Sequence, residues 1–107
     1  MITVWSLYIP CVVKGTTVTS LKSLIDIKAA DYSFIDEVIA QIVYDQLQIE
    51  FLTLIKVKSI QEFDNHYAKK LITHVIYLNL TVQDHIIDIA SMLITQLDQH
   101  QMILEKT

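Results

Sequence analysis

The chain contains no arginine, and this absence limits how it can recognise phosphates and carboxylates. All eight basic residues among its 107 are lysines, set against twelve Asp and Glu, and the formal net charge is −4. Arginine offers a planar fork of donors that matches a phosphate, whereas lysine supplies a point charge. A nucleic-acid interface needs a positive patch, and these lysines are scattered along the sequence. We therefore expect no nucleic-acid partner.

Glycine, proline and cysteine occur once each. So few turn-forming residues exclude a disordered chain, a collagen-like chain and a turn-rich small barrel. The single cysteine, Cys11, permits no intrachain disulfide and no cysteine-based zinc site, which fits a reducing compartment, and we expect a cytoplasmic protein. No apolar run reaches about 18 residues, so we expect no membrane-spanning helix and no membrane partner.

Length and composition together predict a single domain over residues 1–107. The apolar fraction is 52%, and the charged fraction of 19% is low for a surface of this size. A surplus of apolar side chains suggests that another chain covers some of them. We therefore expect a homodimer or a mixed complex.

The first quarter of the sequence predicts a β-hairpin. Residues 2–13 are rich in β-branched and aromatic residues, which favours a strand, and Pro10 would place this strand at an edge or introduce a bulge. Lys14 and Gly15 form a turn signal that would lead to a second strand over about 17–28.

The next segment predicts an amphipathic helix over about 33–47. Asp31 or Ser33 would cap it, with Asp36 and Glu37 in its first turn. Its apolar residues recur at three- and four-residue spacing: Phe34, Ile35, Val38, Ile39, Ile42, Val43 and Leu47.

The second half predicts the same plan again. We expect strands over 49–58 and 71–80, a short helix over 60–69, and a long helix over 82–103 that Thr81 caps. The buried face of the long helix would consist of Val82, Ile86, Ile89, Ala90, Leu93 and Leu97. The predicted fold is therefore α+β, with a ββαββα-like plan. About four antiparallel strands would carry two long amphipathic helices on one face and a short third helix.

One short motif suggests chemistry. Asp26-Ile27-Lys28 ends a predicted strand that a helix and another strand follow, and this order resembles the core of the PD-(D/E)XK nucleases over residues 17–58. The resemblance implies that Asp26 would help to hold a divalent metal and that Lys28 would stabilise charge. The family also needs an acid upstream, and residues 1–25 contain none.

The other reactive side chains form no catalytic or metal-binding pattern. No two histidines lie three or four residues apart, so no local zinc pair exists. Cys11 is followed by Val12 and Val13, which favours a small buried side chain over a nucleophile. We therefore assign no catalytic residue, metal ligand or cofactor, and favour a non-enzymatic protein over an enzyme.

Three functions fit these features. The first is a small acidic protein-binding module, of the kind seen in immunity proteins, antitoxins and phage-type inhibitors, that blocks a basic site on its partner. The second is a metal-dependent or degenerate nuclease-like protein that uses Asp26 and Lys28. The third is a subunit of a larger complex whose exposed strand edge completes a partner's sheet. The candidate interface residues are Trp5, Tyr8, Asp36, Glu37, Asp45 and Asp84.

Overall fold

Seven strands and one helix make up the part of the chain that the structure describes. The computed structural model describes residues 8–15, 20–27, 32–61 and 69–104. Its elements are β1 (Tyr8–Lys14), β2 (Ser20–Ile27), β3 (Ser33–Asp36), α1 (Glu37–Leu47), β4 (Leu52–Gln61), β5 (Lys69–Val82), β6 (His85–Thr95) and β7 (Met102–Leu104).

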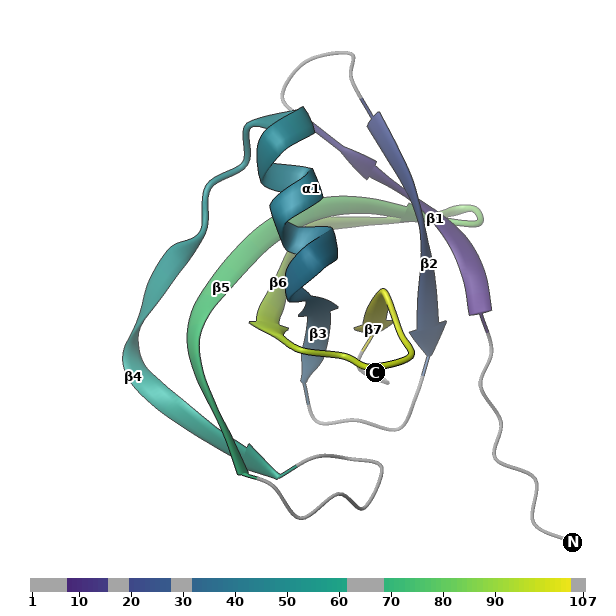
Figure 1. Cartoon of the computed structure of the whole chain (residues 1–107). Coiled ribbons are helices and arrows are strands. Elements are labelled where there is room, and N and C mark those ends of the chain that lie inside the picture. Colours follow the sequence, from purple (N-terminus) through teal and green to yellow (C-terminus); the bar gives the residue numbers. More distant parts are fainter. Residues whose placement is uncertain (1–7, 16–19, 28–31, 62–68, 105–107) are drawn as a thin grey trace, which may run out of the picture.

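Six of the strands close into a barrel (Figure 1). Their order is β1-β2-β7-β3-β6-β5, and β5 returns to pair with β1. The pairing is mixed, because β7 runs parallel to β2 and β3 runs parallel to β6, whereas the other pairs are antiparallel. Closure leaves no free edge among these six strands, and a free edge is a liability for an isolated sheet.

The length of β5 lets it serve two parts of the molecule. Of its fourteen residues, those from Val75 to Val82 pair with β6 along one edge. Along the other edge, residues 79–82 pair with β1, whereas residues 69–75 pair with β4. β4 and the first half of β5 therefore form a two-stranded arm that continues the sheet beyond the barrel, as Figure 1 shows on the left.

Alternating residues of the strands fill the barrel, as the period of two in a β-strand requires. Ile76, Leu78 and Leu80 on β5 face inward beside Cys11 and Val13 on β1, and all five are buried. Each such side chain contributes about 1.5–3 kcal/mol through burial. The opposite, outer face carries a second apolar cluster, which consists of Phe34, Ile72, Val75, Leu93, Leu97 and Ile103.

Helix α1 covers one end of the barrel. Its buried residues Ala40, Val43 and Leu47 belong to the same cluster as the barrel interior. In Figure 1 the helix lies in front of the ring of strands, and it contacts β2, β3 and β6. The barrel interior thus covers one apolar face of the helix, whereas Val38, of the same predicted pattern, is exposed.

Asp36 joins the helix to the barrel and to the β6–β7 connection. One carboxylate oxygen accepts a hydrogen bond from the Val38 N–H at 3.0 Å and so caps α1. The other accepts from the Leu97 N–H at 2.8 Å, across 61 positions of sequence. The Asp36 N–H in turn donates to the Gln101 carbonyl at 2.9 Å. A single residue therefore holds both the start of α1 and the loop from Gln96 to Gln101.

The predicted α+β fold is wrong, because the described residues form a closed barrel with one short helix. The largest error is the helix predicted over 82–103, where the structure has β6 and β7. A β-bulge explains it. Leu80 pairs with Ile87 but Leu78 pairs with Ala90, so β6 has one extra residue. The inward positions Ile87 and Ala90 are then three apart, which imitates helical spacing.

The bulge has a cost in backbone conformation. Ile89 has a φ of 55°, although a β-branched residue strongly disfavours the left-handed region. Such a conformation costs about 1–3 kcal/mol. The Asn79 side chain accepts a hydrogen bond from the Ile89 N–H at 3.0 Å, which satisfies the backbone group that the bulge removes from the ladder.

The remaining corrections concern boundaries and caps. The helix predicted over 33–47 exists, but it begins at Glu37 and Asp36 caps it, because residues 33–36 form β3. Thr81 caps no helix and lies in β5. The short helix predicted over 60–69 is wrong at both ends, because residues 60 and 61 belong to β4 and residue 69 belongs to β5. Its middle, residues 62–68, lies outside the described part of the chain.

Excluding a small barrel from the scarcity of glycine was also wrong. Two tight positions use glutamine in the left-handed region instead, Gln48 after α1 and Gln83 in the β5–β6 turn.

The first hairpin is confirmed, because β1 and β2 pair antiparallel. Proline has no backbone N–H to donate to a neighbouring strand. Pro10 is tolerated in β1 because the pairing of β1 with β5 starts only at the next residue, Cys11.

Replacing Asp36 with alanine should destabilise the fold by about 2 kcal/mol, because it removes a helix cap and a second charge-assisted hydrogen bond. Asp45→Ala is the matched control, since Asp45 is exposed on the same helix and accepts a hydrogen bond from the Gln41 side chain. It should change stability by less than about 0.5 kcal/mol. Urea unfolding of both variants measures the difference, and equal losses would contradict the role of Asp36.

Candidate functional site

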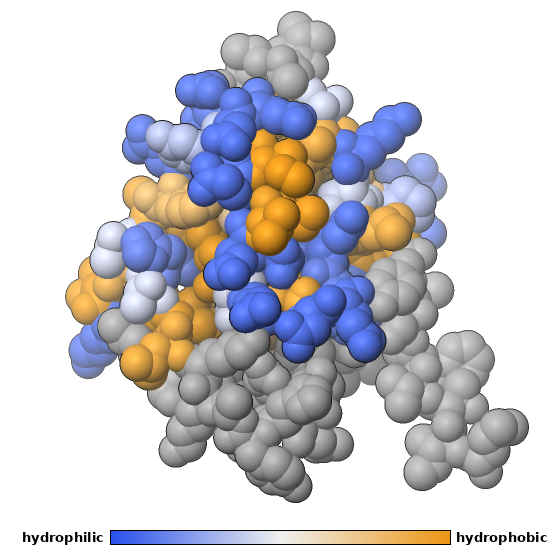
Figure 2. Space-filling model, viewed as in Figure 1, coloured by the Kyte–Doolittle hydropathy of each residue, from blue (hydrophilic) through white to orange (hydrophobic). Residues whose placement is uncertain are grey.

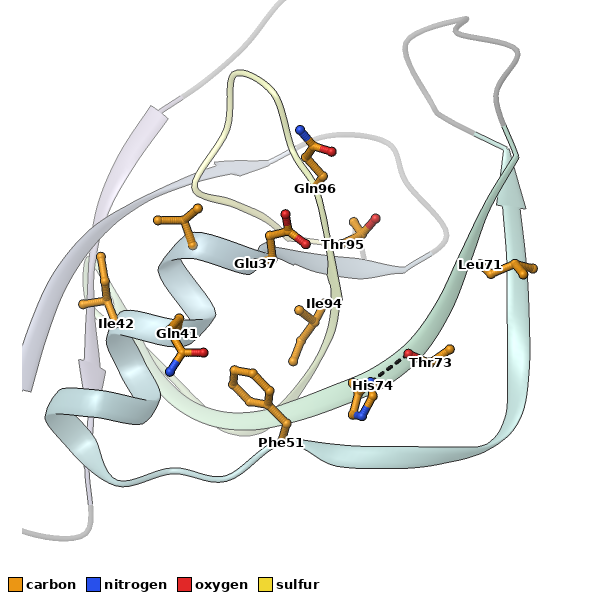
Figure 3. Close-up of a pocket in the computed structure, with 11 residues that line it drawn as sticks. Glu37, Gln41, Ile42, Phe51, Leu71, Thr73, His74, Ile94, Thr95 and Gln96 are labelled. Carbon is orange, nitrogen blue, oxygen red and sulfur yellow. Dashed lines mark hydrogen bonds between the residues drawn. The ribbon is translucent and has the colours of Figure 1, made fainter.

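An open cleft of about 850 Å³ lies between α1 and the first half of β5. The first two turns of α1 form one wall, β5 forms the opposite wall, and the end of β6 lies between them (Figure 3). The residues that line it are Glu37, Val38, Gln41, Ile42, Phe51, Leu71, Thr73, His74, Ile94, Thr95 and Gln96.

The floor of the cleft is apolar and anchored to the core. Phe51 and Ile94 are half-buried and pack against the cluster that fills the barrel. Figure 3 shows the Phe51 ring directed toward Ile94 beneath α1. The ring also lies 5.8 Å from the Tyr44 ring on α1, measured between centroids. Aromatic contacts of this kind hold the floor in one geometry.

Helix α1 presents an acidic stripe beside an apolar one. Glu37, Gln41 and Asp45 are spaced four residues apart and are all exposed, and the Gln41 amide donates to the Asp45 carboxylate at 3.0 Å. Val38, with 62% of its surface exposed, and Ile42 follow the same spacing next to them. Residues at this spacing lie on one face of a helix. Figure 2 shows apolar side chains bordered by hydrophilic ones over this helix.

The opposite wall adds neutral polar groups. Thr73 and His74 are exposed on β5, and the Thr73 hydroxyl lies 2.7 Å from His74 Nδ1. Together with Gln96 they give the rim both donors and acceptors. The cleft thus combines an apolar floor, a negative wall and a polar wall, an arrangement that suits a ligand with apolar groups flanked by cations.

The structure brings some of the predicted interface residues together and separates others. Glu37 lies on the cleft and Asp45 continues its acidic stripe. Asp36 lies next to Glu37, but backbone N–H groups occupy both of its carboxylate oxygens. Asp84 is exposed in the β5–β6 turn, about 30 Å along β5 from the cleft. Trp5 lies outside the described residues.

Tyr8 lies at the start of β1 and is opposite Asp26 of β2 in the register, and the structure describes its backbone without its side chain. It therefore remains a predicted interface residue.

The cleft residues on β5 and β6 were missed by the sequence analysis. Phe51, His74 and Ile94 carry no local signal, and the helix predicted over 82–103 placed Ile94 in the wrong element.

Asp26, the centre of the nuclease-like motif, is fully buried in β2. Its Oδ2 lies 3.3 Å from Nδ1 of His100, whose side chain is 10% exposed. Lys28 lies outside the described residues. Within the described ranges no group of three or more His, Cys, Asp or Glu side chains is placed to hold a metal ion. A carboxylate with no solvent-accessible surface offers little access to a metal and its nucleic-acid substrate.

Comparison with models of protein families, with characterised proteins and with solved structures gave no match for this chain. In the part of the chain that the structure describes, no helix has the length and apolar content needed to cross a membrane.

Cys11 should behave as a buried, unreactive thiol. It is 2% exposed in the barrel interior, and desolvation by burial raises the pKa of the Cys11 thiol to about 11. Because the thiol of the unfolded chain ionises first as pH rises from about 9 to 11, it lowers folding stability across that window. Urea unfolding at pH 8 and pH 10.5 should show a smaller loss for Cys11→Val than for the unaltered chain.

The same thiol should react with a disulfide reagent many times more slowly in the folded chain than in urea. Folded and unfolded chains that react equally fast would show that Cys11 is accessible.

Proposed function

We propose that this chain is a non-enzymatic protein-binding module, and that the cleft between α1 and β5 receives a segment of its partner. The observation that carries the proposal is the acidic stripe of Glu37 and Asp45 beside the apolar floor of Phe51 and Ile94. Charged groups at the rim of an interface steer association, and apolar groups at its centre supply most of the affinity.

The spacing of the two carboxylates defines the partner. Glu37 and Asp45 are eight residues apart on a helix, which separates them by about 12 Å along its axis. An extended segment spans that distance in about four residues. The partner segment therefore carries two basic residues about four positions apart, with apolar side chains between them that reach Phe51 and Ile94. An extended peptide reaches both carboxylates and also brings apolar side chains to the floor between them, which favours a protein over a compact metabolite.

This mode of binding is typical of proteins that block a basic site, such as immunity proteins, antitoxins and phage-type inhibitors, and it is compatible with a cytoplasmic location. The nuclease-like alternative has no support from the geometry, since Asp26 is buried beside His100. The alternative of a subunit in a larger complex is favoured by one observation, the exposed edge of the β4–β5 arm.

Neutralising the acidic stripe should weaken partner capture. In Glu37→Gln/Asp45→Asn the shape of the cleft is kept and two rim charges are lost, and each is worth about 0.5–1 kcal/mol. Affinity purification of tagged chains from the native host, quantified by mass spectrometry, should recover about five- to thirtyfold less of a basic partner. Asp84→Asn removes a carboxylate far from the cleft and should leave recovery unchanged.

Equal recovery with the cleft variant and the Asp84 control would contradict the proposal. For the purified pair, the association rate should also fall steeply as salt is added, because rim charges act mainly on the rate of encounter. An association rate that does not depend on salt would exclude the acidic stripe from the interface.

The arm offers a surface for self-association or for a second subunit. β4 is the last strand of the sheet, and among the described residues its outer edge pairs with no other strand. Ile55 is fully exposed on it, in a stretch where the register with β5 is interrupted between Thr53 and Lys58. Leu52 and Leu71 are also exposed on the arm. Exposed aliphatic side chains in such a group are typical of an interface.

Sedimentation velocity should therefore detect a dimer at about 10–100 µM for the unaltered chain. Ile55→Lys places a charge in the apolar contact and should yield a monomer, whereas the conservative Ile55→Val should remain a dimer. A chain that is monomeric over the whole range, or an Ile55→Lys variant that still dimerises, would contradict self-association through the arm.

A further inference from the structure

A second pocket, of about 630 Å³, opens at the end of the barrel opposite α1. Strand β3 runs from one end of the barrel to the other. Ser33, its first residue, lines this pocket, and α1 begins directly after its last residue, Asp36. Its walls continue the barrel interior and are formed by Ile9, Val82, Ile87, Ala90 and Leu104. The mouths of β-barrels are a common place for small-molecule sites, and the volume lies in the usual range.

The polar groups of the pocket define the chemistry it accepts. Ser33, Gln83, His85 and Ser91 line it, and among its described lining residues there is no lysine and no carboxylate. His85 pairs with Val82 in the register, so it shares the inward face of the hairpin. Asp84 and Asp88 lie on the same hairpin and disfavour an anion. A buried cation would find no carboxylate in the lining, so the pocket favours an uncharged ligand.

Backbone strain is concentrated at the same mouth. Gln83 and Ile89 both have positive φ angles, of 54° and 55°, and both line the pocket. The bulge at Ile89 turns Ile87 and Ala90 into the barrel and leaves Ile89 at the rim with 70% of its surface exposed. Bulges at barrel rims often re-aim side chains for function, and strained residues cluster at ligand sites.

Exposed apolar side chains flank the opening. Ile86 is 67% exposed next to Ile89, so the two aliphatic side chains border the mouth without being buried by the barrel. Neither side chain gains much from folding alone, and Ile89 also holds an unfavourable backbone conformation. A ligand in the mouth would bury both side chains, and it would contact the Ile89 side chain in the position at the rim where the bulge holds it.

We propose that the barrel mouth is a binding site for a small uncharged ligand with an apolar body and one or two hydroxyl, aromatic amine or amide groups. The apolar body lies against Ile9, Val82 and Leu104, and its polar end bonds to His85 and Gln83. Ile86 and Ile89 cover the part of the ligand that remains outside the barrel. This site is independent of the cleft at the other end, so its failure would leave the protein-binding proposal intact.

The test uses 1-aminoanthracene, an uncharged aromatic amine whose fluorescence rises in apolar surroundings, titrated against the full chain. We expect saturable binding of one dye per chain with a dissociation constant in the micromolar range. Ile89→Gly should raise the melting temperature by about 4 °C, because glycine adopts the left-handed region without strain. The same variant should weaken dye binding about tenfold, because it removes the side chain at the rim.

Two controls locate the dye. Ile86→Ser should weaken binding as Ile89→Gly does, whereas Val38→Ser, in the cleft at the other end, should leave it unchanged. The proposal is overturned if no saturable signal is seen up to about 100 µM dye. It is also overturned if Ile89→Gly binds the dye as the unaltered chain does, or if Val38→Ser is the variant that loses binding.

Discussion

The hydrogen bonds of Asp36 are the constraint on which the rest of the structure depends. Its carboxylate caps α1 through Val38 and holds Leu97, and its N–H donates to the carbonyl of Gln101. Helix α1 has eleven residues and is too short to be stable in isolation, so it depends on this cap and on the packing of Ala40, Val43 and Leu47 against the barrel. Because Asp36 fixes the start of the helix next to the end of β6, it also fixes the two walls that define the α1–β5 cleft.

The bent, fourteen-residue β5 divides the molecule into regions with separate roles. Its second half closes the barrel against β1, and its first half forms the arm and one wall of the cleft. The barrel interior then has one end covered by α1 and another bordered by the strained hairpin at Ile89. Protein binding is proposed where polar side chains surround an apolar floor, and small-molecule binding where the barrel interior opens.

Local patterns in the sequence predicted an element correctly where the spacing of apolar residues matched the period of the element that forms. The amphipathic spacing of Val38, Ile42 and Leu47 marked the helix, and the β-branched runs marked β1 and β5. The pattern failed over 82–103, because one bulged residue made inward positions of a strand look helical. The closure of β5 on β1 depends on contacts far apart in sequence, which no local period encodes. For the same reason Glu37 and Asp45 could be predicted as exposed acids, whereas their position opposite His74 could not.

Hydrogen exchange by NMR of the Leu97 amide tests the central claim most directly. Leu97 lies in the loop between β6 and β7, and its N–H is bonded to the Asp36 carboxylate rather than to a neighbouring strand. If Asp36 holds this loop, the Leu97 amide should exchange about as slowly as the amides of the barrel strands, and the protection should disappear in Asp36→Ala. Exchange at the rate of the exposed neighbour Asp98 would show that the loop is open, and that Asp36 does not fix the walls of the cleft.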